Sequence, residues 1–245
     1  MNKNIIPKKW ILIRGLTRSH FHWFEFKNLI KNELNLDSVE CPELPGNGFL
    51  HQLNSPTDLL TCVNELKKQI APINEPVGIL AISLGGMIAT KWALEYPSEI
   101  SHLVIINSSF SLSPFYDRLM PKNYLKILKI LFLSNPKKIE EFILSSTSNT
   151  KKWINILQDC IQFQSQHPIS LKNFIRQIKL AKHSQFKSKP QCQVTVLTSE
   201  NDHLVNYKCS LTIAKHWQIN PHIHPTAGHD LPLDDGLWII EQIKN

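Results

Sequence analysis

The chain is predicted to adopt an α/β fold around one mostly parallel sheet, and three features of the sequence indicate this. Short apolar runs alternate with amphipathic helical stretches along most of the 245 residues, a pattern typical of parallel strands joined by crossover helices. Hydrophobic residues make up 42% of the chain, which is enough for one large core. The apolar run 79–82 ends at a serine and continues directly into a helical stretch. One domain accounts for the whole chain.

The serine at position 83 lies in the most informative segment, 79–86. An apolar strand that meets a serine among small residues and then becomes a helix is typical of a nucleophile elbow, a strained turn that exposes the hydroxyl. The pattern is A-x-S-x-G-G rather than G-x-S-x-G, and alanine is small enough for the same turn. The alternative is an ordinary turn in which Ser83 caps the following helix. Ser83 is therefore the candidate nucleophile.

A nucleophilic serine needs a base and an orienting acid, which follow it at the ends of later strands in the order Ser, Asp, His. The apolar strand predicted at 194–197 leads into a polar turn that contains Asp202, and a short strand at 222–224 is followed by His229 before the last helix. A helix-capping aspartate and a surface histidine are the alternatives. Because all three residues occur in the required order, we predict a catalytic triad of Ser83, Asp202 and His229.

These motifs make the chain resemble the α/β-hydrolase family over nearly its whole length, and within it most closely the pimeloyl-ACP methyl ester esterases of biotin synthesis. The shared features are Arg14-Gly15-Leu16 with a tryptophan a fixed distance later, Leu44-Pro45-Gly46-Asn47-Gly48, the S-L-G-G elbow and the Ala-Gly-His before the last helix. General carboxylesterases, lactonases and a menaquinone-pathway lyase carry them too. The resemblance implies an α/β-hydrolase fold with helices on both sides of the sheet. Because only nine residues precede the strand at 10–13, the N-terminal hairpin of many relatives is expected to be shortened or absent.

The resemblance further implies an oxyanion hole made of two backbone N–H groups, those of Leu16 and Leu84. Leu16 follows the first predicted strand, and Leu84 follows the serine. Arg14 stands where most relatives have histidine. Two interpretations of this arginine remain open: a salt bridge that braces the loop, or a cation that favours an acidic substrate.

Three residues resemble family positions that contact the substrate: Trp23 at the mouth of the pocket, and Phe142 and Ser146 in the acyl channel. Phe142 and Ser146 are four residues apart, so both can lie on one face of a helix. Ordinary core packing is the alternative for all three residues.

Residues 111–190 are predicted to form a helical lid over the elbow, and residues 1–110 and 191–245 the α/β-hydrolase core. Prolines at 114, 121, 136 and 168 mark the starts of the lid helices. The lid carries 14 Lys and Arg against 4 Asp and Glu, a net charge of +10, whereas the rest of the chain carries −3. A positive surface of this kind attracts anionic partners.

An acidic acyl carrier protein is the partner that this charge and the resemblance favour. The lid lacks the interleaved glycine and aromatic motifs of nucleic-acid binding, so no nucleic acid is expected. A solvated lysine-rich surface is the alternative. We expect the protein to be a monomer.

No cofactor and no metal are expected. The three histidines near the C-terminus, His222, His224 and His229, have no matching cluster of carboxylates or cysteines. The five cysteines are odd in number and lack C-x-x-C spacing, so they are predicted to be reduced core residues. No apolar stretch reaches the length of a signal peptide or of a membrane span, so we expect a cytoplasmic protein without membrane association.

The sequence therefore predicts a serine carboxylic-ester hydrolase. Ser83 would attack the ester carbonyl while His229 takes its proton, and water would then cleave the acyl-enzyme. A pimeloyl-ACP methyl ester is the leading substrate, with a general short-chain carboxylesterase or thioesterase as the alternative. Two other classes remain: a carbon–carbon lyase that uses the same residues to abstract a proton, and a silent binding module that uses only the basic lid.

Overall fold

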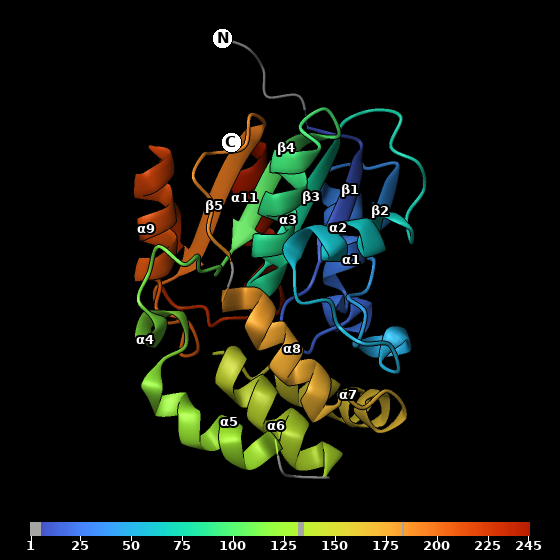
Figure 1. The fold of residues 1–245 in the computed structure, drawn as a ribbon, viewed down its shortest axis with the longest axis vertical. Helices are drawn as coiled ribbons and strands as arrows, with labels where there is room; N and C mark the ends of the chain where they lie inside the picture. The colour runs from blue at the N-terminus through green and yellow to red at the C-terminus, as the bar shows by residue number, and fades with distance from the viewer. Residues whose placement is uncertain (1–5, 132–134, 183) are drawn as a thin grey trace.

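The computed structural model describes residues 6–131, 135–182 and 184–245, and in them six strands form one sheet (Figure 1). Every pair of neighbouring strands is parallel. The strand order is β2-β1-β3-β4-β5-β6. The strands are β1 (Lys9–Ile13), β2 (Ser38–Glu40), β3 (Val77–Ile82), β4 (Ile100–Ile106), β5 (Gln193–Ser199) and β6 (His222–His224).

Helices cover both faces of this sheet (Figure 1). On one face α1 (Phe26–Glu33) and α11 (Gly236–Lys244) pack together, and on the other lie α2 (Leu59–Lys67), α3 (Leu84–Glu95) and α9 (Lys208–Trp217). The central strand β3 is buried at every position, which explains its uninterrupted apolar sequence. The α/β fold with a parallel sheet flanked by helices is thus confirmed. No helix in the described ranges has the length and hydropathy needed to cross a lipid bilayer.

The N-terminal edge of the sheet differs from the shortened hairpin that was one of the two expected forms. β1 is the first strand and both of its neighbours, β2 and β3, run parallel to it, so the part of the chain that the structure describes contains no N-terminal hairpin, shortened or otherwise. The described residues before β1 are few and include Pro7, which cannot donate a backbone hydrogen bond to a neighbouring strand. The sheet is therefore wholly parallel in these residues rather than mostly parallel.

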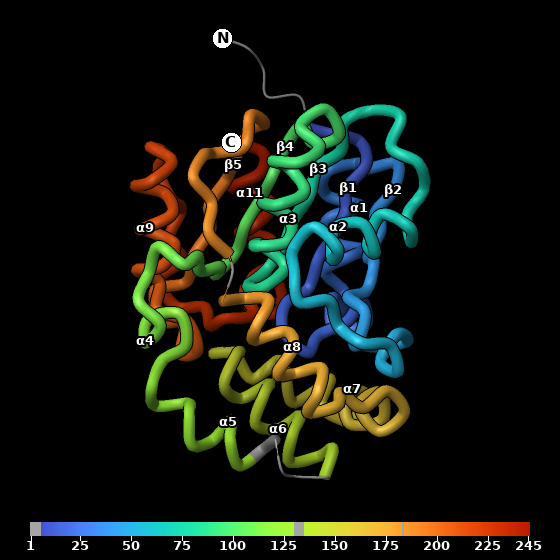
Figure 2. Tube along the Cα trace, in the orientation of Figure 1, coloured from blue at the N-terminus to red at the C-terminus, as the bar shows by residue number. Residues whose placement is uncertain are grey.

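The segment between β4 and β5 is helical and lies beyond one end of the sheet, as Figure 2 shows along the chain trace. We call residues 111–190 the lid. Pro121 and Pro136 each begin a helix there, and Pro114 is the N-cap of another, as expected for a residue whose fixed φ suits the first turn. The lid contains α4 (Phe115–Arg118), η3 (Pro121–Asn123), α5 (Tyr124–Leu131), α6 (Pro136–Thr147), α7 (Trp153–Gln166) and α8 (Leu171–Lys182).

Candidate active site

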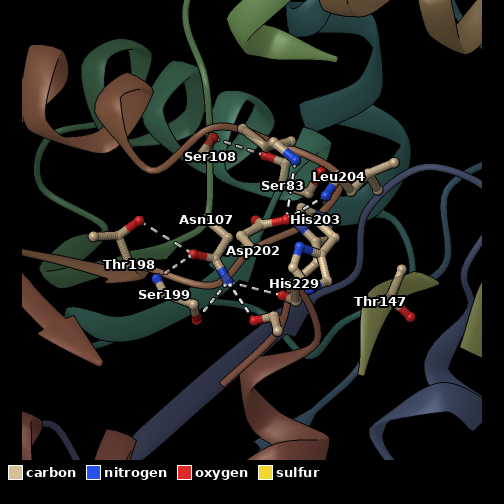
Figure 3. A network of polar contacts seen from close by, with 12 residues as sticks. Ser83, Asn107, Ser108, Thr147, Thr198, Ser199, Asp202, His203, Leu204 and His229 are labelled. Atoms are coloured by element: carbon tan, nitrogen blue, oxygen red, sulfur yellow. Dashed lines mark hydrogen bonds and ion pairs between the residues drawn. The ribbon is translucent and has the colours of Figure 1, made fainter. Parts of the chain in front are cut away.

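Ser83 occupies a strained turn between β3 and α3. Its φ of 57° and ψ of −122° lie outside the regions that non-glycine residues normally adopt, and such strain is typical of functional sites. The Ser83 side chain makes no capping hydrogen bond to α3, which removes the main argument for the helix-cap alternative. Its backbone is held by Ser108, whose Oγ donates to the Ser83 carbonyl at 2.8 Å (Figure 3).

Glycine at position 85 brings the start of α3 against the end of β1. A Cβ atom on Gly85 would lie 2.4 Å from the Ile13 carbonyl oxygen and 2.7 Å from that of Arg14. Any side chain would therefore separate the elbow from the loop that follows β1. The first glycine of the S-L-G-G sequence is thus explained by close packing of two backbones, and the second leaves room for the Ser108 side chain, whose Oγ would be 2.7 Å from a Cβ on Gly86.

His229 and Asp202 form a buried pair beside the elbow (Figure 3). His229 Nδ1 lies 2.6 Å from Asp202 Oδ2, while Asp202 Oδ1 accepts hydrogen bonds from the backbone N–H groups of Leu204 at 2.7 Å and Val205 at 3.0 Å. An ionised carboxylate only accepts, so Nδ1 carries the proton and Nε2 is left as the basic nitrogen. The structure therefore brings the predicted acid and base together in the expected orientation.

Asn107, which is not among the predicted site residues, fixes the loop that carries the histidine. Its Nδ2 donates to the carbonyl oxygens of His229 at 2.9 Å and Gly228 at 3.2 Å, and its Oδ1 accepts from the backbone N–H of Ser199 at 2.8 Å (Figure 3). The residue has a φ of 46°, a conformation that asparagine tolerates better than most residues. An asparagine placed directly after an apolar strand was the available signal for this role.

A cavity of about 680 Å³ opens above Ser83 and His229, and its walls are mostly apolar. Phe142 and Ser146, predicted for the acyl channel, both lie in its wall on α6. Whether they bind substrate stays a prediction. The other apolar wall residues come from α3, α4, α5, α6, α8 and the loop after Asp202, and include Met87, Leu119, Ile127, Ile139, Ile143, Phe174, Ile178, Leu204 and Val205.

Trp23 does not lie at the mouth of this cavity, so that prediction is wrong. It is 2% exposed, stacks on Phe26 with ring centroids 5.7 Å apart, and is covered by the Arg14 guanidinium 4.9 Å from its ring centroid. The residue belongs to the 3₁₀ helix η1 (His20–Trp23), whose turn directs it into the core beside α1. Core packing, the alternative interpretation, explains Trp23.

Arg14 forms a buried, two-pronged salt bridge with Asp230. Its Nη1 and Nη2 donate to the two carboxylate oxygens at 3.0 and 2.6 Å. Burial by itself would raise the pKa of the Asp230 carboxyl, but the Arg14 charge outweighs it and holds this pKa below its usual value. Because Asp230 follows His229, the pair ties the loop after β1 to the loop of the base. Of the two interpretations of Arg14, the bracing salt bridge is the one that the contacts support.

The two predicted oxyanion donors lie close to the serine. A Cβ atom on Gly15 would be 3.0 Å from Ser83 Cβ and 3.5 Å from Leu84 N, so the loop that carries Leu16 lies directly against the elbow. Leu16 and Leu84 both contribute to the cavity wall. Within the described ranges, neither backbone N–H has a hydrogen-bond acceptor, so both remain available for a developing negative charge.

One cluster among the described residues has the composition and spacing of a metal site: His22, Glu140 and Cys160. Arg18 already fills it, since its Nη1 lies 3.0 Å from His22 Nε2 and 2.8 Å from a Glu140 oxygen. Burial and then the Arg18 charge hold the pKa of His22 well below its usual value, and burial raises the pKa of Cys160 to about 12. A cation would have to displace the guanidinium, so the cluster is an ion-pair network rather than a metal site.

The comparisons with known proteins agree with this architecture. Residues 11–236 match the family described as the alpha/beta hydrolase fold, and the chain belongs to that family. A search of curated proteins finds no match.

Among solved structures, the chain is similar to a putative lipase (lip1) from Acinetobacter baumannii AYE, with 23% identity, a TM-score of 0.74 and coverage of 97% of this chain and 82% of that one. A thermophilic esterase from Thermogutta terrifontis gives 15% identity, a TM-score of 0.69 and coverage of 98% and 89%. The 2-hydroxy-6-oxo-6-phenylhexa-2,4-dienoate hydrolase of Rhodococcus sp. strain RHA1 gives 16% identity, a TM-score of 0.73, and coverage of 98% of this chain and 91% of that one. At these identities the similarity establishes the fold alone.

Proposed function

We propose that the protein is a serine carboxylic-ester hydrolase. The observation that carries this proposal is the hydrogen-bonded pair of His229 and Asp202 at a cavity that also contains the strained Ser83. Nucleophile, base and acid follow one another in the chain in the order that the fold requires. The unpaired N–H groups of Leu16 and Leu84 supply the remaining component, an oxyanion hole.

In the proposed reaction, Ser83 Oγ attacks the carbonyl carbon of the ester while His229 Nε2 takes the hydroxyl proton. The charge on the tetrahedral oxygen is stabilised by the Leu16 and Leu84 N–H groups, and Asp202 stabilises the imidazolium. The carbon–oxygen bond to the alcohol then breaks and His229 returns the proton to the leaving alkoxide. Water attacks the acyl-enzyme by the same route, releasing the acid and free Ser83.

The cavity favours substrates with an extended apolar acyl chain. Its volume of about 680 Å³ is in the range of sites that enclose whole small ligands, about 300–1,000 Å³, and far exceeds what an acetyl group fills. A pimeloyl-ACP methyl ester, whose acyl chain is a run of methylene groups, is our leading substrate. A general carboxylesterase or thioesterase, and a lyase that uses His229 to abstract a proton, are the alternatives.

The basic lid supports the further proposal of an acidic acyl carrier protein as partner. Lys137, Lys138 and Lys151 are exposed on it, and Lys137 has a long contact of 3.8 Å with Glu141. A cytoplasmic location is proposed as well, supported by five cysteines that are all free thiols.

Turnover of p-nitrophenyl esters tests the proposed function. We expect hydrolysis that improves from acetate to medium-length acyl chains, and loss of about 10⁴-fold or more in kcat for Ser83→Ala, with an unchanged melting temperature. Ester hydrolysis by Ser83→Ala at the wild-type rate would contradict the mechanism, and a folded wild-type protein that cleaves no ester would favour the lyase. Rescue of a biotin-auxotrophic bacterium that lacks its pimeloyl methyl esterase would select the leading substrate.

A further inference from the structure

The loop that carries Leu16 has an unfavourable backbone conformation. Residues 15–18 form a tight turn in which the Arg18 N–H donates to the Gly15 carbonyl at 3.3 Å. The third residue of this turn, Thr17, has a φ of 61°, which turns of this kind usually assign to glycine. For a β-branched residue this is a clear outlier. Such a conformation persists only when neighbouring groups hold it.

Gln177 of α8 is one such group. This buried side chain, 1% exposed, accepts a hydrogen bond at Oε1 from the Thr17 N–H at 3.0 Å. Its Nε2 donates to Asn47 Oδ1 at 2.7 Å and to Ser55 Oγ at 3.1 Å. Asn47 in turn donates from Nδ2 to the Arg18 carbonyl at 2.8 Å. One residue of the lid therefore fixes the turn at Thr17 directly and at Arg18 through Asn47.

Glu140 of α6 is the second group that holds the turn at residues 15–18. Its carboxylate accepts from Arg18 Nη1 at 3.0 and 2.8 Å, and both side chains are buried. A buried ion pair is costly to separate, since either charge would be left without compensation. Two lid helices thus hold the backbone and the side chain of the turn that presents Leu16.

We propose that Gln177 and Glu140 are positioning residues through which the closed lid assembles the oxyanion hole. The inference rests on the proposed ester hydrolysis and adds to it a requirement that the lid be seated before the transition state is stabilised. If Thr17 relaxed to a negative φ, the course of the turn would change and the Leu16 N–H would move away from the elbow. Displacements of about 1 Å in such groups cost on the order of 10²-fold in rate.

Asn173 provides a matched control for Gln177. It lies one turn earlier on α8 and is also buried, at 3% exposed. It also makes three hydrogen bonds to the core: Oδ1 accepts from the Ser55 N–H at 3.0 Å, and Nδ2 donates to the carbonyls of Leu53 at 2.8 Å and His51 at 3.3 Å. None of these contacts reaches residues 15–18. Asn173 therefore anchors the same helix without touching the oxyanion loop.

The experiment compares Gln177→Met with Asn173→Leu. We expect similar decreases in melting temperature, because each change removes three hydrogen bonds between lid and core. Only Gln177→Met should lower kcat for a p-nitrophenyl ester, by about 10- to 100-fold with KM changed less than about threefold. It should weaken inhibition by butylboronic acid, whose tetrahedral serine adduct occupies the oxyanion hole, by a similar factor. The pH profile of kcat/KM should not move, since His229 and Asp202 are untouched.

A second variant separates positioning from general damage. Thr17→Gly in the Gln177→Met background should recover part of the lost kcat, because glycine adopts a positive φ without strain. If Gln177→Met or Asn173→Leu does not fold, Gln177→Asn and Asn173→Ala are milder changes that keep the comparison.

Equal losses of kcat in the Gln177 and Asn173 variants, or a loss of kcat with unchanged boronic acid affinity, would overturn the inference. In either case wild-type ester hydrolysis that depends on Ser83 would leave the proposed function intact. If the wild-type protein cleaves no ester, the proposed function fails first and the inference falls with it.

Discussion

Asn107 and Gln177 are both buried amides that join segments far apart in the sequence, but they differ in the segments that they join. Asn107 connects the end of β4 to β5 and to the loop of His229, all within the core. Gln177 connects the loop after β1 to the lid. Asn107 therefore ties the loop of the base to the sheet, although the lid reaches that loop too, since the Asp230 N–H donates to the Thr147 carbonyl at 2.7 Å. The oxyanion loop is tied to two lid helices, through Gln177 and Glu140.

The largest expected effect concerns Asp202 and Asp230, the two aspartates that hold His229 and its loop. Asp202→Asn should leave His229 in the wrong tautomer and lower kcat by about 10³- to 10⁴-fold. Asp230→Asn should lower kcat far less, but because it leaves Arg14 buried without its partner it should reduce the free energy of unfolding by about 3–5 kcal/mol. Ester kinetics and urea unfolding of both variants check this. A greater loss of kcat in Asp230→Asn than in Asp202→Asn would show that Asp202 is not the catalytic acid.

A double-mutant cycle tests whether the contacts of Asn107 and those of Gln177 affect kcat independently. Asn107→Ala should lower kcat by about 10- to 100-fold by loosening the His229 loop, and Gln177→Met by a similar factor through the oxyanion loop. Because the two amides share no partner, the double variant should show the product of the two losses, within about 0.5 kcal/mol. A coupling energy well above that value would show that lid and base loop move as one unit.

A smaller effect should come from the outer surface of the lid. Reversing Lys137, Lys138 and Lys151 to Glu should raise KM for a carrier-linked methyl ester about tenfold and spare a small free ester. The preference of the wild-type protein for the carrier-linked ester over the free ester should also shrink as ionic strength rises through about 0.15 M, where the screening length is roughly 8 Å. Lys152 is left unchanged because its Nζ donates to the Asp234 carbonyl at 3.0 Å, joining lid to core. Equal losses on both esters would indicate a merely solvated surface.

The last effect is on stability against pH, and it concerns two buried histidines, His102 in β4 and His22 in η1. Burial lowers the pKa of His102 in β4 to about 4, and burial with the Arg18 charge lowers that of His22. Both stay neutral in the folded protein, whereas the unfolded chain takes up protons below about pH 6.5. Stability should therefore be complete above that pH and fall as pH decreases, by at most about 1.4 kcal/mol per unit for each histidine.

Urea unfolding at pH 7, 6 and 5 measures this dependence. Each of the variants His102→Gln and His22→Gln should reduce the slope of the free energy of unfolding against pH, because each removes one histidine that takes up a proton on unfolding. A free energy of unfolding that does not change between pH 7 and pH 5 in the wild-type protein would contradict the neutral state of both histidines.

The elements that the sequence predicts well are those encoded locally. The strand, serine and helix at 79–86 specify their own turn, and the aspartate and histidine follow strands that can be recognised from apolar runs. The position of Trp23 could not be predicted, because a short 3₁₀ turn decides whether it faces cavity or core. The role of Gln177 could not be predicted either, because its partner Thr17 is 160 residues away along the chain and no short pattern encodes that contact.

Replacing the lid by that of a relative, in order to change the substrate range, would assume that the insert and the core are separable modules. The contacts of Thr17 with Gln177 and of Arg18 with Glu140 mean that this protein does not divide cleanly at residues 111 and 190. A chimera that receives a foreign insert should keep the glutamine of position 177 and the glutamate of position 140, at the same places on the corresponding helices. Without them, a graft that folds and admits its new ester would still turn it over slowly.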